Sequence, residues 1–464
     1  MHTSKPAGRH AHTAARHFLR ACCTAAFFAL LTLPAALAAQ DPAEPPAGHP
    51  AANALPRPAG AISPDAIDLP YLRAVDQELV ACGTRLSLSS WDDPHRGIGC
   101  ARDRILARYQ QIAKDSGGRL QVSVDKFEAT SPRTSNQPAH FENIVAILPG
   151  SDRLLAKTVF LVSGHFDSRA SDVMDPKVDA PGADDDASGV AVALAAARVL
   201  SRDTYRATLL FAAVSGEEQG LLGGTRLLAY LQEQGYQVGG FLNNDIVGAD
   251  SAPGAPHRVR VFSGGGREGP EEMDSPSREL ALAVEEIARR DAVRLIFRID
   301  RLGRGGDHRP FVEAGLPAVR FTEPLENYDH EHQTPRTENG REYGDFGKYL
   351  NFTFIRNVAR DNSEVLRVLA LAPAPPAHVT LAGGVTPDAK LDFSAPQDPQ
   401  RSGFEILWRE TTDPRWSLYE FVATPGQTVL SGVSTDNHFF AVRAVGKNGA
   451  RSLAVPAAEA APAP

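Results

Sequence analysis

The sequence predicts an α/β protein with a mostly parallel central sheet and helices on both faces, followed by a small C-terminal β-sandwich. Across residues 67–372, short apolar runs alternate with segments of helical spacing, a pattern typical of parallel sheets. Residues 379–460 instead carry evenly spaced strand-like runs with turn signals and no helical period. The proline-rich segment 373–378 marks a linker between these two domains.

Each strand predicted in the first domain is an apolar run bounded by glycine or polar turn residues, as buried strands are. The predicted strands are 158–165, 207–216, 241–248, 258–265 and 316–323. One predicted helix follows Asp186, where an alanine-rich run begins, and a second covers 275–290 after a Ser-Pro start. A long helical pattern over 346–371 closes the domain.

Composition is that of a globular protein, because 42% of the 464 residues are hydrophobic and 22% are charged. The length is sufficient for two or three domains with a large core. The formal net charge of -8 is mild and argues against nucleic acid as a partner.

The first 39 residues have the pattern of a cleavable signal peptide. A basic stretch that includes Lys5 and Arg20 precedes an apolar run, and Ala36 and Ala38 fit a small-x-small cleavage site, with cleavage near Ala38. We therefore expect a secreted or periplasmic protein whose mature chain has no membrane span. Residues 40–66 are rich in proline and alanine and predict an extended leader.

Export changes the interpretation of the cysteines. Cys22 and Cys23 leave with the signal peptide, so that Cys82 and Cys100 remain as a pair in an oxidising compartment. We expect them to form a disulfide that closes a loop of roughly 19 residues. Because such a bond lowers the conformational entropy of the unfolded chain, it would stabilise the fold by about 3 kcal/mol. A metal half-site is the alternative, but no CxxC pattern supports it.

Polar residues gather where the predicted strands end. Since ligands of open α/β sheets bind at the carboxyl ends of the strands, these residues are expected to converge on one crevice. Each stretch by itself also fits a helix cap or a turn, but five such stretches at strand ends favour a site. The residues are His165, Asp167, Asp184, Asp185, Asp186, Glu217, Glu218, Asp245, His330 and His332.

The chemistry of these residue types favours zinc. Imidazoles and carboxylates without a thiolate suit Zn²⁺ better than Mg²⁺ or Ca²⁺. The acids outnumber the ligands of one tetrahedral ion, which predicts two zinc ions per chain, roughly 3.5–4 Å apart and sharing a carboxylate. Of the adjacent glutamates Glu217 and Glu218, one would bind metal while the other accepts a proton from the attacking water.

The ordered motifs GHFDS, GADDDASG, SGEEQGLLG, LNNDIVG, DHxxF and a final His resemble the dizinc aminopeptidases of metallopeptidase family 28, clan MH, over about 300 residues. This resemblance implies peptide substrates and a zinc exopeptidase fold. It assigns Glu217 as general base and Asp167 as the acceptor that fixes the tautomer of His165. The implied metal ligands are His165 and Asp245 for one zinc, Glu218 and His332 for the other, and Asp185 as the bridge.

Two segments depart from the family pattern. The final histidine lies in HEHQTPRT, where the spacing to Thr337 selects His332 and leaves His330 as the alternative ligand. In GRGGDHRPF the family's serine is replaced by Gly306, and we expect Asp307 and His308 to line the substrate cleft.

Other functions are compatible with parts of the pattern. A carboxypeptidase of the same clan would need basic residues for a terminal carboxylate, for which Arg301 and Arg304 are candidates. A glutaminyl cyclase shares the fold with one zinc, and a non-haem iron oxygenase would need an all-β domain. A binding protein without metals is the remaining alternative.

The C-terminal module resembles fibronectin type III through Trp408 in EILWRE and the closing FAVRAVGKNG. Its partner is not evident from its residues. The leading prediction is an exported aminopeptidase that removes residues from the free amino end of peptides.

Overall fold

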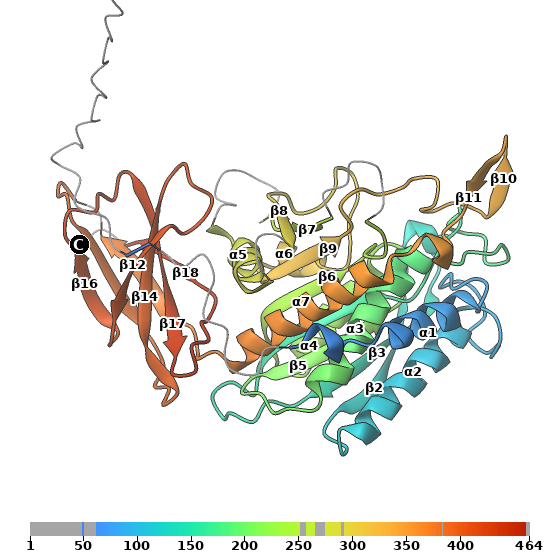
Figure 1. Ribbon diagram of the computed structural model, residues 1–464, viewed down its shortest axis with the longest axis horizontal. Helices are drawn as coiled ribbons and strands as arrows, with labels where there is room; N and C mark the ends of the chain where they lie inside the picture. Colours follow the sequence, from blue (N-terminus) through green and yellow to red (C-terminus); the bar gives the residue numbers. More distant parts are fainter. Residues whose placement is uncertain are drawn as a thin grey trace, which may run out of the picture. The chain divides into compact units, whose positions relative to one another are not determined.

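A sheet of eight strands runs through the first part of the described chain in the order β2-β3-β5-β4-β6-β9-β7-β8 (Figure 1). The computed structural model describes residues 49–50, 62–250, 257–264, 274–288, 292–382 and 384–460. The central strands β5, β4, β6 and β9 are parallel, whereas β2, β3 and the β7–β9 contact are antiparallel. The strand bounds are β2 Gln121–Ala129, β3 Ala139–Leu148, β4 Thr158–His165, β5 Thr208–Val214, β6 Gln237–Asn244, β7 Val259–Phe262, β8 Val293–Ile296 and β9 Ala318–Thr322.

Helices cover both faces of this sheet, which confirms the predicted fold class. The helices that share the larger core are α1 Leu69–Val80, α2 Ile98–Asp115, α3 Ser188–Leu200, α5 Pro276–Ala288 and α7 Phe352–Leu371. Helices α4 Leu222–Glu233 and α6 Arg309–Glu313 pack into the core on the opposite face.

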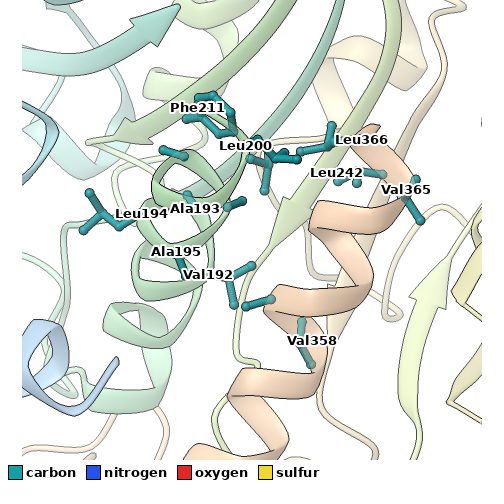
Figure 2. Close-up of a cluster of buried hydrophobic side chains, with 14 of the residues drawn as sticks. Val192, Ala193, Leu194, Ala195, Leu200, Phe211, Leu242, Val358, Val365 and Leu366 are labelled. Carbon is teal, nitrogen blue, oxygen red and sulfur yellow. The ribbon is translucent and has the colours of Figure 1, made fainter. Parts of the chain in front are cut away.

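The two cores follow from the alternation of side chains along buried strands. On β5, Phe211 belongs to the larger core, while its neighbour Leu210 belongs to the core on the other face. Figure 2 shows Phe211 on the same side of the sheet as Leu200 of α3 and Leu366 of α7. Each such fully buried apolar side chain contributes on the order of 1.5–3 kcal/mol to folding.

Two of the predicted boundaries differ from the observed ones. Strand β4 occupies the predicted 158–165, but the predicted strand 241–248 ends at Asn244, and the backbone at Ile246 has a positive φ of 61°. The predicted helix 346–371 starts only at Phe352, because the Asn351 side chain accepts hydrogen bonds from the first helical N–H groups.

The predicted disulfide between Cys82 and Cys100 is present and joins the segment after α1 to the first turn of α2. Helix α1 itself and the β2–β3 hairpin were not among the predicted elements. Among the described residues, no helix is long and apolar enough to cross a membrane.

Two sheets of mostly antiparallel strands follow α7. They enclose an apolar core that includes Phe393, Phe404, Trp408 and Phe440. The first contains β12 Ala377–Ala382, β13 Ala389–Ser394, β16 Gly426–Leu430 and β19 Ala458–Glu459. The second contains β1 His49–Pro50, β14 Arg401–Glu410, β15 Leu418–Val422, β17 His438–Gly446 and β18 Val455–Pro456. C-terminal β-sheets are thus confirmed, while the fibronectin type III resemblance stays a prediction.

The predicted signal peptide, residues 1–39, lies outside the described residues, as does most of the predicted leader. Of the leader, residues 49–50 and 62–66 are described, and the backbone N–H of Ile62 bonds to Glu364 of α7. The exact domain boundaries stay predictions. A separate exposed hairpin, β10 Arg336–Glu338 with β11 Arg341–Tyr343, lies between β9 and α7.

Candidate metal centre and active-site cavity

Five of the predicted site residues converge at the carboxyl edge of the parallel strands. His165 ends β4, while Glu218 and Asp245 follow the ends of β5 and β6. Asp185 lies in the turn before α3, and His332 lies in the long loop after β9. Their donor atoms form two groups of three, the candidate metal groups, with all atoms of a group within 4.8 Å of one another. The first group is His165, Asp185 and Asp245, and the second is Asp185, Glu218 and His332. Asp185 belongs to both groups.

The shared carboxylate points one oxygen at each histidine. Asp185 Oδ1 lies 3.0 Å from His165 Nε2, and Asp185 Oδ2 lies 2.8 Å from His332 Nε2. Asp245 Oδ1 completes the first group 3.8 Å from His165 Nε2. Glu218 Oε1 completes the second group 3.2 Å from His332 Nε2. Asp185 therefore faces both groups through different oxygens of one carboxylate.

The donor atoms fit zinc. His165 Nε2 and Glu218 Oε1 are buried and have no well-formed hydrogen bond to any described residue, an uncommon condition for buried polar atoms. Although burial opposes ionisation, His165 and His332 hold the pKa of Asp185 well below its usual range. Cations in the two groups would replace the protons that these imidazoles otherwise carry.

The other two aspartates of the triplet have separate structural partners. Asp186 Oδ1 accepts a hydrogen bond from Gly189 N at 2.8 Å, and its Oδ2 accepts one from His165 N at 3.0 Å. Asp186 therefore supports both the start of α3 and the end of β4. Asp184 Oδ1 accepts a bond from Gly248 N at 2.6 Å, which fixes the loop after β6.

Asp167, to which the resemblance assigns the role of hydrogen-bond acceptor, lies next to His165 Nδ1. His165 Nδ1 is 3.1 Å from the main-chain oxygen of Asp167 and 3.5 Å from its carboxylate Oδ1. The main-chain oxygen is thus the nearer acceptor for the imidazole N–H. The carboxylate Oδ2 accepts a hydrogen bond from Glu218 N at 3.1 Å, so Asp167 orients one residue of each metal group.

Glu217 lines the same cavity as Asp185, Asp245 and His332. Burial is the main cause that raises the pKa of Glu217 well above its usual range, and nearby carboxylates add to it while His165 opposes it. A carboxylate that takes up a proton readily in this position suits the role of general base.

The structure distinguishes the two candidate histidines. The imidazole of His330 stacks on the ring of Tyr349 with centroids 3.7 Å apart and belongs to neither metal group. His332 has a positive φ of 53°, and its Nε2 faces Asp185 and Glu218. The geometry therefore favours His332 as the ligand.

Asp307 and His308 do not line the cavity, so their predicted contact with substrate finds no support in this geometry. Both side chains are fully buried at the start of α6. Asp307 Oδ1 accepts a hydrogen bond from Gly224 N at 3.0 Å, and His308 Nε2 lies 2.8 Å from the main-chain oxygen of Ile299. They hold α4, α6 and the loop before α6 together.

Sequence reasoning missed Arg320, a fully buried cation on β9. Its Nη2 donates to Asp245 Oδ1 at 2.7 Å, and its Nη1 donates to the main-chain oxygen of Gly305 at 2.5 Å. A charged residue inside the otherwise apolar run AVRFT was the available signal, since such a residue requires a buried partner.

The cavity in front of the metal groups has a volume of about 590 Å³, within the range of sites for small ligands. Its walls carry the arginines Arg133, Arg169, Arg301, Arg304 and Arg309. Arg301 and Arg304, the candidates for binding a terminal carboxylate, both pair with buried Glu326.

Residues 143–350 match peptidase family M28. A probable zinc metalloprotease of Leptosphaeria maculans is 39% identical over 408 residues, which cover 83% of this chain and 93% of that protein. A second probable zinc metalloprotease, from Pyrenophora tritici-repentis, is 38% identical over 417 residues, 84% of this chain and 85% of its own. Among solved structures, the LapA aminopeptidase of Legionella pneumophila is similar with 20% identity and a TM-score of 0.48, over 66% of this chain and 73% of that one.

Proposed function

The chain belongs to peptidase family M28 and is a zinc metallopeptidase, and from this premise we propose that it is an exported aminopeptidase with two zinc ions. The observation that carries the proposal is the placement of Asp185. Its two carboxylate oxygens face His165 and His332, the histidines of the two separate donor groups. One metal ion would leave one of these groups without a function.

His165, Asp245 and Asp185 would hold the first zinc, and Asp185, Glu218 and His332 the second. Zinc ions bound there supply a water molecule of lowered pKa and polarise the scissile carbonyl. Glu217 lies on the cavity wall with Asp185, Asp245 and His332, where its carboxylate would accept the proton of the attacking water. Glu217 then returns the proton to the departing amine.

The carboxylates of this centre also favour the amino end of a peptide. Glu217, Glu218 and Asp245 all line the cavity and offer oxygens to an ammonium group. The carboxypeptidase alternative relied on Arg301 and Arg304, but Glu326 already pairs with both. Export is supported by the signal-like residues 1–39 and by a disulfide of the kind that forms in oxidising compartments.

The test is metal analysis by mass spectrometry of the purified protein, with hydrolysis of an amino-acid anilide measured on the same sample. We expect about two zinc ions per chain and an activity that falls by at least about a hundredfold in Glu217→Gln, since general bases contribute about 10²–10⁴-fold. Zinc content should remain at the wild-type level in this variant. A single zinc ion, or a Glu217→Gln variant of unchanged activity, would contradict the proposal.

A further inference from the structure

Within the described residues, two arginines on the cavity wall beside Glu218 have no acidic partner other than Glu218 itself. Arg133 Nη1 donates to the main-chain oxygen of Glu218 at 2.7 Å. Arg169 Nη1 lies 3.9 Å from Glu218 Oε2, and its other nitrogens donate to the main-chain oxygens of Ala170 and Ser171. Glu218 is itself a proposed metal ligand, so it would share its charge with the metal and compensate these cations only in part.

The position of Arg133 is fixed by the short 3₁₀ turn Pro132–Thr134 that carries it. Ser131 caps this turn, and its Oγ donates to the main-chain oxygen of Gln219 at 2.6 Å. The turn is thereby held against the segment that supplies Glu217 and Glu218. Within the described residues, Nη1 is the one nitrogen of the Arg133 guanidinium that forms a hydrogen bond, which leaves donors for a ligand.

The other three arginines of the cavity wall differ from this pair, because each has an acidic partner outside the cavity lining. Arg301 and Arg304 both pair with Glu326, and Arg304 also lies 3.3 Å from Glu331. Arg309 pairs with Glu313 one helical turn away, at 2.9 Å. Each of these arginines has an acidic partner outside the cavity lining, and Arg260 shares Glu326 with Arg301 and Arg304. Within the described residues, Arg133 and Arg169 are the arginines of the cavity wall that have no acidic partner outside the cavity.

We propose that Arg133 and Arg169 form a subsite for a carboxylate of the substrate, so that the enzyme selects anionic peptides. This inference rests on the proposed peptidase function and adds a substrate class to it. Guanidinium groups bind carboxylates through charge-assisted, often bidentate hydrogen bonds. With cations in the metal groups to offset the central acids, the wall that bears Arg133 and Arg169 attracts anions.

The substrate carboxylate has two possible sources, an acidic side chain or the C-terminus of a short peptide. Three matched pairs of peptides separate them: Glu-Ala amide with Gln-Ala amide, Ala-Glu-Ala amide with Ala-Gln-Ala amide, and free Ala-Ala with Ala-Ala amide. The quantity compared is the ratio of kcat/KM within each pair. We expect a ratio of about tenfold or more in favour of the anionic member of at least one pair. The pair that shows it identifies the source.

The variants Arg133→Gln and Arg169→Gln are expected to reduce that ratio severalfold, mainly through a higher KM for the anionic peptide. Arg309→Gln is the matched control, because it removes a cation from the same cavity that has its own acidic partner. Its ratio should stay at the wild-type value. Zinc content and Tm are measured for every variant to show that the fold is retained.

A binding measurement keeps this test independent of catalysis. In the Glu217→Gln variant, calorimetric titration should show tighter binding of the preferred anionic peptide than of its amide partner. The difference should shrink when Arg133→Gln or Arg169→Gln is added. Ratios near one in all three pairs, or an equal loss in Arg309→Gln, would overturn the subsite. Failure to hydrolyse any of the peptides would instead count against the proposed function, while the titration still decides the subsite.

Discussion

Replacement of Glu279 by glutamine should make the folded protein more stable at alkaline pH without changing it at pH 5. Glu279 is a buried residue of α5, and its Oε2 accepts a hydrogen bond from Trp416 Nε1 at 2.9 Å. Burial is the main cause that raises the pKa of Glu279 to about 8, with Trp416 opposing it. Among the neighbouring charges, Asp274 and Glu286 raise the pKa further, whereas Arg409 lowers it.

The sign follows from proton binding. Between the unfolded pKa near 4.5 and the folded pKa of about 8, the folded protein holds a proton on Glu279 that the unfolded chain has lost. The free energy of unfolding therefore falls as pH rises through this window and levels off above it. Each pKa unit corresponds to about 1.4 kcal/mol, so ionisation of Glu279 destabilises the fold by up to about 5 kcal/mol. Glutamine keeps the acceptor for Trp416 and removes this ionisation.

The assay is the midpoint of chemical unfolding for wild type and Glu279→Gln, measured from pH 5 to pH 9. The two proteins should coincide near pH 5 and diverge above it, with the variant more stable at pH 9. Glu286→Gln is the matched control on the same helix, because its carboxylate pairs with Arg443 at 2.9 Å and its loss should destabilise the protein across this range. Parallel curves for wild type and Glu279→Gln would refute the reasoning.

Two further predictions concern the metal centre and its support. His332→Gln should lower the zinc content by about one ion per chain. His330→Gln should retain all of the zinc, because His330 stacks on Tyr349 and belongs to neither donor group. Mass spectrometry measures the zinc content of both variants, and zinc loss from His330→Gln would reverse the ligand assignment. Arg320→Met should destabilise the metal-free protein by about 3–5 kcal/mol, since it removes the buried cation that pairs with Asp245 and Asp300. The midpoint of unfolding measures this loss, and an unchanged midpoint would show that the pair contributes little.

The part of the site that could be predicted lies at strand ends. His165 and Glu218 follow long apolar runs, and the geometry of parallel sheets brings such positions to a common edge. This rule required only the order of strands along the chain. For the same reason the predicted fold class was correct without knowledge of the antiparallel strands β2 and β3.

The residues that were missed depend on contacts between distant parts of the chain. Arg133 precedes Glu218 by 85 residues, and their contact arises only when the turn after β2 packs on the segment after β5. Arg320 and Asp245 are 75 residues apart and meet only because β6 and β9 are neighbours in the sheet. Local patterns carry no information about such pairings. Asp307 and His308 are the converse case: their motif is visible in the sequence, but both side chains are buried and do not line the cavity.

The triplet of aspartates shows why charge crowding by itself does not identify a ligand. Three adjacent carboxylates repel one another unless each has its own partner. Asp184 and Asp186 find theirs in backbone N–H groups, which explains them as structural acids. Asp185 instead faces two imidazoles, those of His165 and His332, and cations could replace the protons on these imidazoles. Of the three aspartates, only Asp185 belongs to the candidate metal groups, while its neighbours support the end of β4, the start of α3 and the loop after β6.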